Sequence, residues 1–178
     1  MTWVALLRGI NVGRNKRLAM ADLRRILESL GFENVRTHLQ SGNAIFSTER
    51  TGAAKLERQI ADALREDAGL DVRVLCRTAA ELDAVVQANP FAGKGDPKEL
   101  HAVFVSATPA TKRLAEVGPE QFAPNEFVAG DRVIYMRLPK GVMGGPLPDW
   151  DRALALDATM RSWGTVSRLH DLASRGAG

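Results

Sequence analysis

The chain has 178 residues, of which 45% are apolar and 25% are charged. This length allows one compact domain or two small lobes that share a core, and the composition excludes a disordered chain. No apolar run reaches the roughly 18–20 residues that cross a bilayer, so we expect no membrane partner. The net charge of +3 is uneven, because residues 1–25 carry a net +5 and the other residues a net −2. The basic N-terminal patch favours anionic partners without distinguishing among them.

The N-terminal segment and the single cysteine indicate where the protein resides. The apolar segment 3–8 has no basic residue before it and no small-residue cleavage site, so it is predicted to be a first strand rather than a secretory signal. Cys76 is the single cysteine, which excludes an internal disulfide and is typical of a reducing cytosol. We therefore expect a cytoplasmic protein. Cys76 shares a strand face with Val72 and Val74, which favours a packed core thiol over a nucleophile.

The first half of the chain predicts six elements in the order β-α-β-β-α-β. Strand 3–8 leads into a loop, and helical spacing of apolar residues begins at Met20 and stops at Gly31. Strands at 34–38 and 44–47 follow, then a helix with an apolar stripe at 56–64 and a strand at 72–76. This order is the split βαβ arrangement of ferredoxin-like domains. Both sides of the first strand are apolar, so both of its faces should be covered.

The second half of the chain repeats most of this order. A helix is predicted at 80–86, a strand at 102–105, a short helix from Thr108, and a hairpin with strands at 127–128 and 133–136. Arg161 and Trp163 are predicted to open the last helix, with no fourth strand before it. We therefore predict an α+β fold. An N-terminal ferredoxin-like βαββαβ lobe, residues 1–78, packs on a smaller related βαββα lobe, residues 79–178, as one compact unit.

Several sequence blocks point to a known family. The segment 5–13 reads ALLRGINVG, and further blocks lie at 20–23, 30–32, 40–43, 89–91 and 159–166. Together they resemble the DUF1697 family of uncharacterised, mostly bacterial proteins. The resemblance implies a two-lobed α+β fold. It assigns no reaction to the chain, because the family has no established activity. The chain departs from the family's usual pattern at Arg14, at Ser162 and in the loop 141–145, where the family usually has a glycine or lysine, an asparagine and a serine.

The strongest candidate site is the first loop, residues 8–16, which runs from a strand into a helix. Glycines let backbone N–H groups converge, and a helix N-terminus favours negative charge, so such loops bind phosphate or carboxylate groups. Arg14 and Lys16 would add charge-assisted bonds. The glycine spacing matches neither a P-loop nor a dinucleotide fingerprint. A purely structural loop, in which Asn11 bonds backbone groups, is the open alternative. The candidate residues of this loop are Arg8, Asn11, Gly13, Arg14 and Lys16.

Two further sets of residues are candidates for the same site. Gln40, Ser41 and Asn43 lie between two predicted strands, where they either line a polar pocket beside the first loop or satisfy the backbone groups of a turn. Ser41 lacks the His and Asp partners of a serine hydrolase. Arg161 either faces a ligand or bonds loop carbonyls.

The remaining polar residues predict no catalytic centre, no metal site and no cofactor. His38, His101 and His170 lack metal-ligand spacing, and the strands lack the basic-Gly-aromatic signature of an RNA-recognition motif. Our leading hypothesis is a binding module for a small anionic ligand at the first loop, and a phosphate-bearing molecule is one ligand of this kind. The alternative is a nucleic-acid or protein interaction module that uses the basic N-terminal patch, and the third hypothesis is an uncharacterised enzyme.

Overall fold

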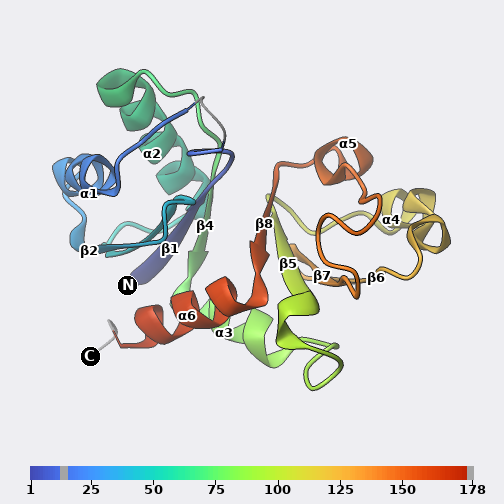
Figure 1. Ribbon diagram of the computed structural model, residues 1–178. Coiled ribbons are helices and arrows are strands. Elements are labelled where there is room, and N and C mark those ends of the chain that lie inside the picture. The colour runs from blue at the N-terminus through green and yellow to red at the C-terminus, as the bar shows by residue number, and fades with distance from the viewer. Residues whose placement is uncertain (13–15, 176–178) are drawn as a thin grey trace. The chain divides into compact units, whose positions relative to one another are not determined.

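The computed structural model describes residues 1–12 and 16–175, and these residues form two four-stranded antiparallel sheets with helices (Figure 1). This confirms the predicted α+β class. The chain divides into two compact units, unit 1 with Met1–Asp83 and Arg168–Gly178, and unit 2 with Ala84–Ser167. The division falls within α3 (Ala79–Gln87) and α6 (Trp163–Ser174). Among the described residues, no helix is both long and apolar enough to cross a membrane.

Unit 1 contains a sheet with the strand order β2-β3-β1-β4. The predicted sequence of elements is confirmed, but the last strand begins two residues later than predicted, because β1 ends at Leu7 and Leu7 pairs with Val74. The elements are β1 (Thr2–Leu7), α1 (Met20–Ser29), β2 (Glu33–His38), β3 (Asn43–Ser47), α2 (Ala53–Ala68) and β4 (Val74–Thr78).

The core of unit 1 lies between this sheet and the helices α1 and α2 (Figure 1). The apolar stripes of the two helices bury six side chains, each 0% exposed. Every residue of β1 is buried, including Val4 and Leu6, which alternate with the helix-facing residues and so lie on the opposite face. These six helix residues are Leu23, Ile26, Leu27, Leu56, Ile60 and Leu64.

The edge strand β4 is protected by a side chain of α2. The backbone N–H of Cys76 donates to Oε1 of Glu57 at 2.8 Å. An edge strand with unpaired N–H groups is a template for pairing with another chain, and Glu57 occupies one of those groups. Cys76 itself is fully buried in the core, as predicted for a packed thiol.

Unit 2 contains a second sheet, with the order β6-β7-β5-β8. The prediction of a βαββα lobe without a last strand, in which Arg161 opens the final helix, is wrong, because Arg161 lies in the strand β8. This strand passes directly into α6 at Trp163 with no turn residue between them, so the sequence offers no boundary signal there. The elements are η1 (Pro97–Glu99), β5 (Leu100–Val105), α4 (Thr111–Val117), η2 (Pro119–Phe122), β6 (Glu126–Gly130), β7 (Val133–Arg137), α5 (Trp150–Leu154) and β8 (Ala158–Ser162).

The central strands of the two sheets end in equivalent hydrogen bonds. In each unit, the last residue of the central strand donates to the residue just before a neighbouring strand, and the next residue donates to the residue just before the edge strand. In unit 1 these bonds are Leu7 N to Gly42 O at 2.8 Å and Arg8 N to Arg73 O at 2.9 Å; in unit 2 they are Val105 N to Arg132 O at 3.1 Å and Ser106 N to Asp157 O at 2.9 Å.

The contribution of the unit 1 core to folding stability can be measured by substituting one buried and one exposed leucine. Leu27 is 0% exposed in α1, whereas Leu39 is 55% exposed. We expect Leu27→Ala to lower the free energy of unfolding by about 2–5 kcal/mol, through lost transfer energy and the cavity left behind. Leu39→Ala should change it by less than about 0.5 kcal/mol. Urea unfolding followed by circular dichroism measures both, and equal losses would contradict this placement of the core.

Candidate functional site

The first loop is fastened by the side chain of Asn11. Its Nδ2 donates to the carbonyl of Leu18 at 2.9 Å and to the carbonyl of Gln40 at 2.6 Å, and its Oδ1 accepts from the N–H of Leu18 at 2.9 Å. The N–H of Asn11 donates to the carbonyl of Lys16. Asn11 thus closes the loop and ties it to the turn before β3. Two other candidates, Gly13 and Arg14, lie outside the described residues.

The turn before β3 packs directly against this loop. Gly42 has a φ of +78°, and a Cβ there would lie 2.7 Å from Cδ1 of Ile10 and 2.8 Å from Cβ of Leu7. Only glycine allows this approach without strain. The structure therefore brings the first loop and the turn together, as required for a shared site.

The polar side chains of this turn bond one another. Asn43 is fully buried, and its Nδ2 donates to the carbonyl of His38 at 2.9 Å and to Oγ of Ser41 at 3.0 Å. An amide cannot remove a proton from a hydroxyl group, so this contact does not activate Ser41 as a nucleophile. The exposed Gln40 contributes its carbonyl to the Asn11 bond.

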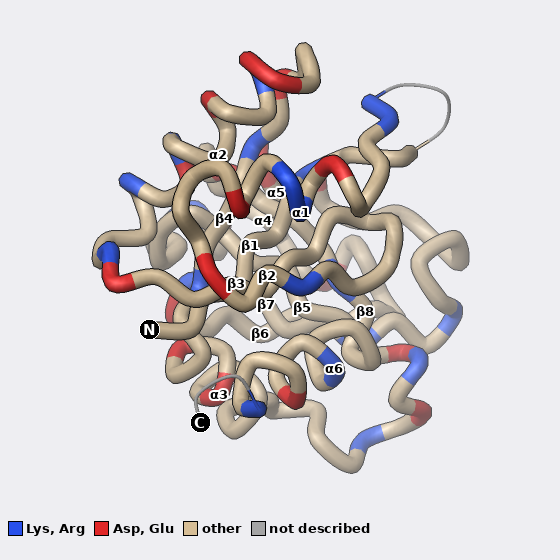
Figure 2. The backbone as a smooth tube through the Cα atoms, turned by 90° about the vertical axis from the view of Figure 1, so that its left-hand side faces the viewer, with Lys and Arg blue, Asp and Glu red and all other residues tan. Residues whose placement is uncertain are grey.

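Three basic residues gather where β1 ends, and we call Arg8, Lys16 and Arg73 the basic edge. Leu7 pairs with Val74 in the antiparallel register, and Arg8 follows Leu7 while Arg73 precedes Val74. Arg8 and Arg73 therefore lie directly opposite each other, and the N–H of Arg8 donates to the carbonyl of Arg73 at 2.9 Å. Nζ of Lys16 donates to the carbonyl of Asp71, two residues before Arg73, at 2.7 Å. Figure 2 shows further basic residues along α1. Sequence analysis missed Arg73, because only the register of β1 and β4 places it beside Arg8.

Arg161 belongs to unit 2 and bonds its own strand. Its Nη1 donates to Oγ1 of Thr159 at 2.8 Å and to the carbonyl of Met160 at 2.9 Å. Burial lowers the pKa of Arg161 to about 10, so its guanidinium is still charged at neutral pH. Arg77 occupies the matching place in unit 1. It lies opposite Val4 as Arg161 lies opposite Ala102, and it is also buried.

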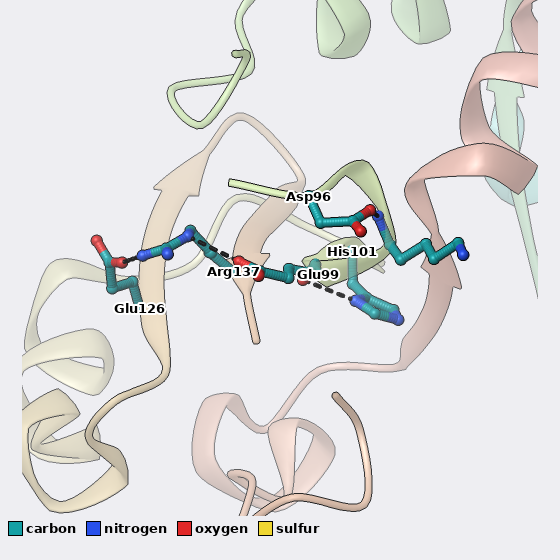
Figure 3. A network of polar contacts seen from close by, with 6 residues as sticks. Asp96, Glu99, His101, Glu126 and Arg137 are labelled. Atoms are coloured by element: carbon teal, nitrogen blue, oxygen red, sulfur yellow. Dashed lines mark hydrogen bonds and ion pairs between the residues drawn. The ribbon is translucent and has the colours of Figure 1, made fainter. Parts of the chain in front are cut away.

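A polar network in unit 2 centres on Arg137 (Figure 3). Its Nε donates to Oε2 of Glu99 at 3.1 Å, and its Nη1 donates to Oε1 of Glu126. The bond to Glu126 raises the pKa of Arg137 above its ordinary value. A Cβ at Gly95 would lie 2.6 Å from Oε2 of Glu99, so the loop before η1 packs closely on this ion pair. The network joins η1 to the edge of the sheet, which is a structural role.

His101 lies beside this network at the start of β5. A carbonyl only accepts, so Nδ1–H of His101 donates to the carbonyl of Glu99, at 3.2 Å. Burial lowers the pKa of His101 from 6.5, and the bond to Glu99 opposes this shift more weakly. Across residues 1–12 and 16–175, no group of three or more His, Cys, Asp and Glu side chains is arranged to hold a metal ion.

Substitution of Gly42 should disturb the junction between the loop and the turn. Gly42→Ala adds a strained positive φ and a clash with Leu7 and Ile10, and we expect a loss of about 2–4 kcal/mol in unfolding free energy. Gly9→Ala is the matched control, because Gly9 has a φ of +67° but nothing within 4 Å of its Cβ position. It should lose only about 1–2 kcal/mol. Similar losses for both variants in urea unfolding would show that the close contact at Gly42 is unimportant.

Protonation of His101 should weaken the fold. Its pKa is lowered in the folded state, so the unfolded chain binds the proton more tightly, and stability present above pH 6.5 is lost as the pH falls. Burial also lowers the pKa of His38, and the positive charge of Arg168 lowers it further by a smaller amount. Proton NMR titration of each histidine separates the two groups. We expect midpoints below 6.5 for both, and a midpoint at or above 6.5 for His101 would contradict its buried environment.

Comparison with known proteins identifies the family and supports the overall fold. No functionally curated protein matches the chain. A solved structure described as "conserved bacterial protein SP0830 from Streptococcus pneumoniae" shares the fold, with a TM-score of 0.72 and 18% sequence identity over 97% of this chain and 98% of that one. The sequence profile of the family described as "Protein of unknown function (DUF1697)" matches residues 1–135. The chain therefore belongs to the DUF1697 family, whose function is unknown.

Proposed function

We propose that the protein binds a small anion, carrying a phosphate or a carboxylate group, at the basic edge of unit 1. The observation that carries this proposal is the register that sets Arg8 opposite Arg73, with Lys16 beside them. Basic side chains that lie close together raise the local concentration of anions. Both guanidinium groups are suited to bidentate binding of phosphate or carboxylate oxygens.

The surroundings of the basic edge support this proposal. Lys16 uses one donor on the carbonyl of Asp71, and an ammonium group has two more to offer a ligand. Asn11 and Gly42 hold the residues just after β1 against the turn before β3, so this part of the site is ordered before an anion binds. The Lys16 bond goes to the backbone carbonyl of Asp71 rather than to its carboxylate.

We also propose that each unit is a ferredoxin-like lobe and that the two lobes are related. In unit 1 the elements run βαββαβ, and the first strand lies between the third and the fourth. Unit 2 has the same strand order and ends its central strand with equivalent hydrogen bonds. The matching positions of Arg77 and Arg161 support a common origin.

Pyrophosphate titration tests the anion site. We expect pyrophosphate to shift the amide NMR signals of Arg8 and Arg73, and we expect Arg73→Gln or Lys16→Gln to weaken its affinity about tenfold. Arg24→Gln is the control, because Arg24 is an exposed residue of α1 outside the basic edge. It should change the affinity less than twofold, which is about 0.4 kcal/mol.

The outcome also separates this proposal from a nucleic-acid interaction module. Unchanged pyrophosphate affinity in Arg73→Gln would refute the anion site. Binding of a short oligonucleotide that falls steeply with salt and weakens equally in Arg24→Gln and Arg73→Gln would favour the interaction module instead.

A further inference from the structure

The helices α4 and α5 of unit 2 form the wall of an open hollow. The two helices pack against each other (Figure 1). The hollow has a volume of about 690 Å³, which is within the usual range for binding sites of small molecules. Its wall combines apolar side chains, among them Val117 and Phe122, with charged side chains of both signs. The charged residues are Arg113 and Glu116 of α4, Asp149 just before α5, and Arg152 of α5.

The apolar part of this wall is held in place by packing. The ring of Phe122 lies edge-on to the ring of Phe127, with centroids 5.8 Å apart and an angle of 62°. Phe127 in turn lies edge-on to Trp150, with a centroid distance of 5.2 Å and an angle of 86°. Val117, which also lines the hollow, is only 9% exposed. A ligand would therefore meet a fixed apolar surface beside the charged groups.

Two charged side chains of α4 line the hollow without pairing. Arg113 and Glu116 are three residues apart, a spacing that makes side chains neighbours on a helix. In α2 the same spacing gives an ion pair, Arg65 with Asp62 at 3.1 Å. Within the described part of the chain, the side chains of Arg113 and Glu116 form neither an ion pair nor a hydrogen bond. Here the basic residue comes first, which is the less favourable order along a helix. Both groups are therefore available to a ligand.

The charged pair at α5 leaves its arginine free as well. Asp149 precedes the helix, and its Oδ1 accepts a hydrogen bond from the backbone N–H of Arg152 at 3.4 Å. The carboxylate is thus used as the cap of the helix. Among the described residues, the guanidinium group of Arg152 has no ion-pair or hydrogen-bond partner. The hollow therefore offers two unpaired guanidinium groups and the unpaired carboxylate of Glu116.

We propose that this hollow binds a zwitterionic amino acid with an apolar side chain. The guanidinium groups of Arg113 and Arg152 bind its carboxylate, which matches their fork of donors. The carboxylate of Glu116 accepts hydrogen bonds from its ammonium group, and its side chain packs on Phe122 and Val117. A ligand with one sign of charge would leave the opposite set of groups unpaired or repelled, so the wall selects against it. This site lies in unit 2 and is independent of the basic edge of unit 1.

Three related probes test the proposal by NMR titration. Compared with L-phenylalanine, 3-phenylpropionate lacks only the ammonium group and 2-phenylethylamine lacks only the carboxylate. Phenylalanine should shift the amide signals of Arg113 and Arg152 and leave those of Arg8 and Arg73 in place. It should bind about fivefold more tightly than either analogue, the effect of one exposed ion pair. Glycine, which lacks the apolar group, should bind at least about tenfold more weakly. Unmoved signals in α4 and α5, or an analogue that binds as tightly as phenylalanine, would overturn the proposal.

Two variants assign each charge of the ligand to its partner. Glu116→Gln should weaken phenylalanine about fivefold and should not weaken 3-phenylpropionate, which has no ammonium group. Arg152→Gln should weaken phenylalanine similarly and should not weaken 2-phenylethylamine. Both residues are exposed, so the fold should tolerate these changes. Glu120→Gln is the matched control, because Glu120 is an exposed acid of η2 outside the wall of the hollow. Full affinity in Glu116→Gln, or an equal loss in Glu120→Gln, would refute the assignment.

Discussion

The structure of each unit depends on a central strand that is buried on both faces. β1 and β5 have neighbours along both edges, and every one of their side chains is buried. A shift by one residue would exchange the two faces and break both ladders at once, so the register is fixed. The bond from Leu7 to Gly42 then determines where the chain leaves β1 and enters the first loop. The positions of Arg8 and Arg73 follow from this register.

The two units place different chemistry on the same kind of sheet. In unit 1, long helices fill one face, and the polar features gather at the end of the central strand. In unit 2, the helices α4 and α5 are short, and the ion pairs of Arg137 hold η1 at the sheet edge.

Most of the fold follows from sequence periodicity, because strong apolar stripes and glycine boundaries mark α1, α2 and the central strands. β8 was missed because Ala158–Ser162 contains few apolar residues and continues into α6 without a turn. The sequence offered Asn11 as a residue that bonds backbone groups, and it left open whether the turn at Gln40 lies beside the first loop. The bond from Asn11 to the carbonyl of Gln40 answers the second point, and it depends on the folded chain. The place of Arg73 opposite Arg8 depends on strand register, which is a property of the folded chain rather than of any local motif.

The burial of Cys76 has a practical consequence. The chain contains one thiol, and this thiol is 0% exposed in the core of unit 1, with its backbone N–H bonded to Glu57. A thiol reagent in solution reaches it only when β4 separates from α2. The rate of modification therefore measures how often this half of the chain opens, while unit 2 contributes no signal. Modification of Cys76 therefore reports the local unfolding of unit 1 without any engineered label.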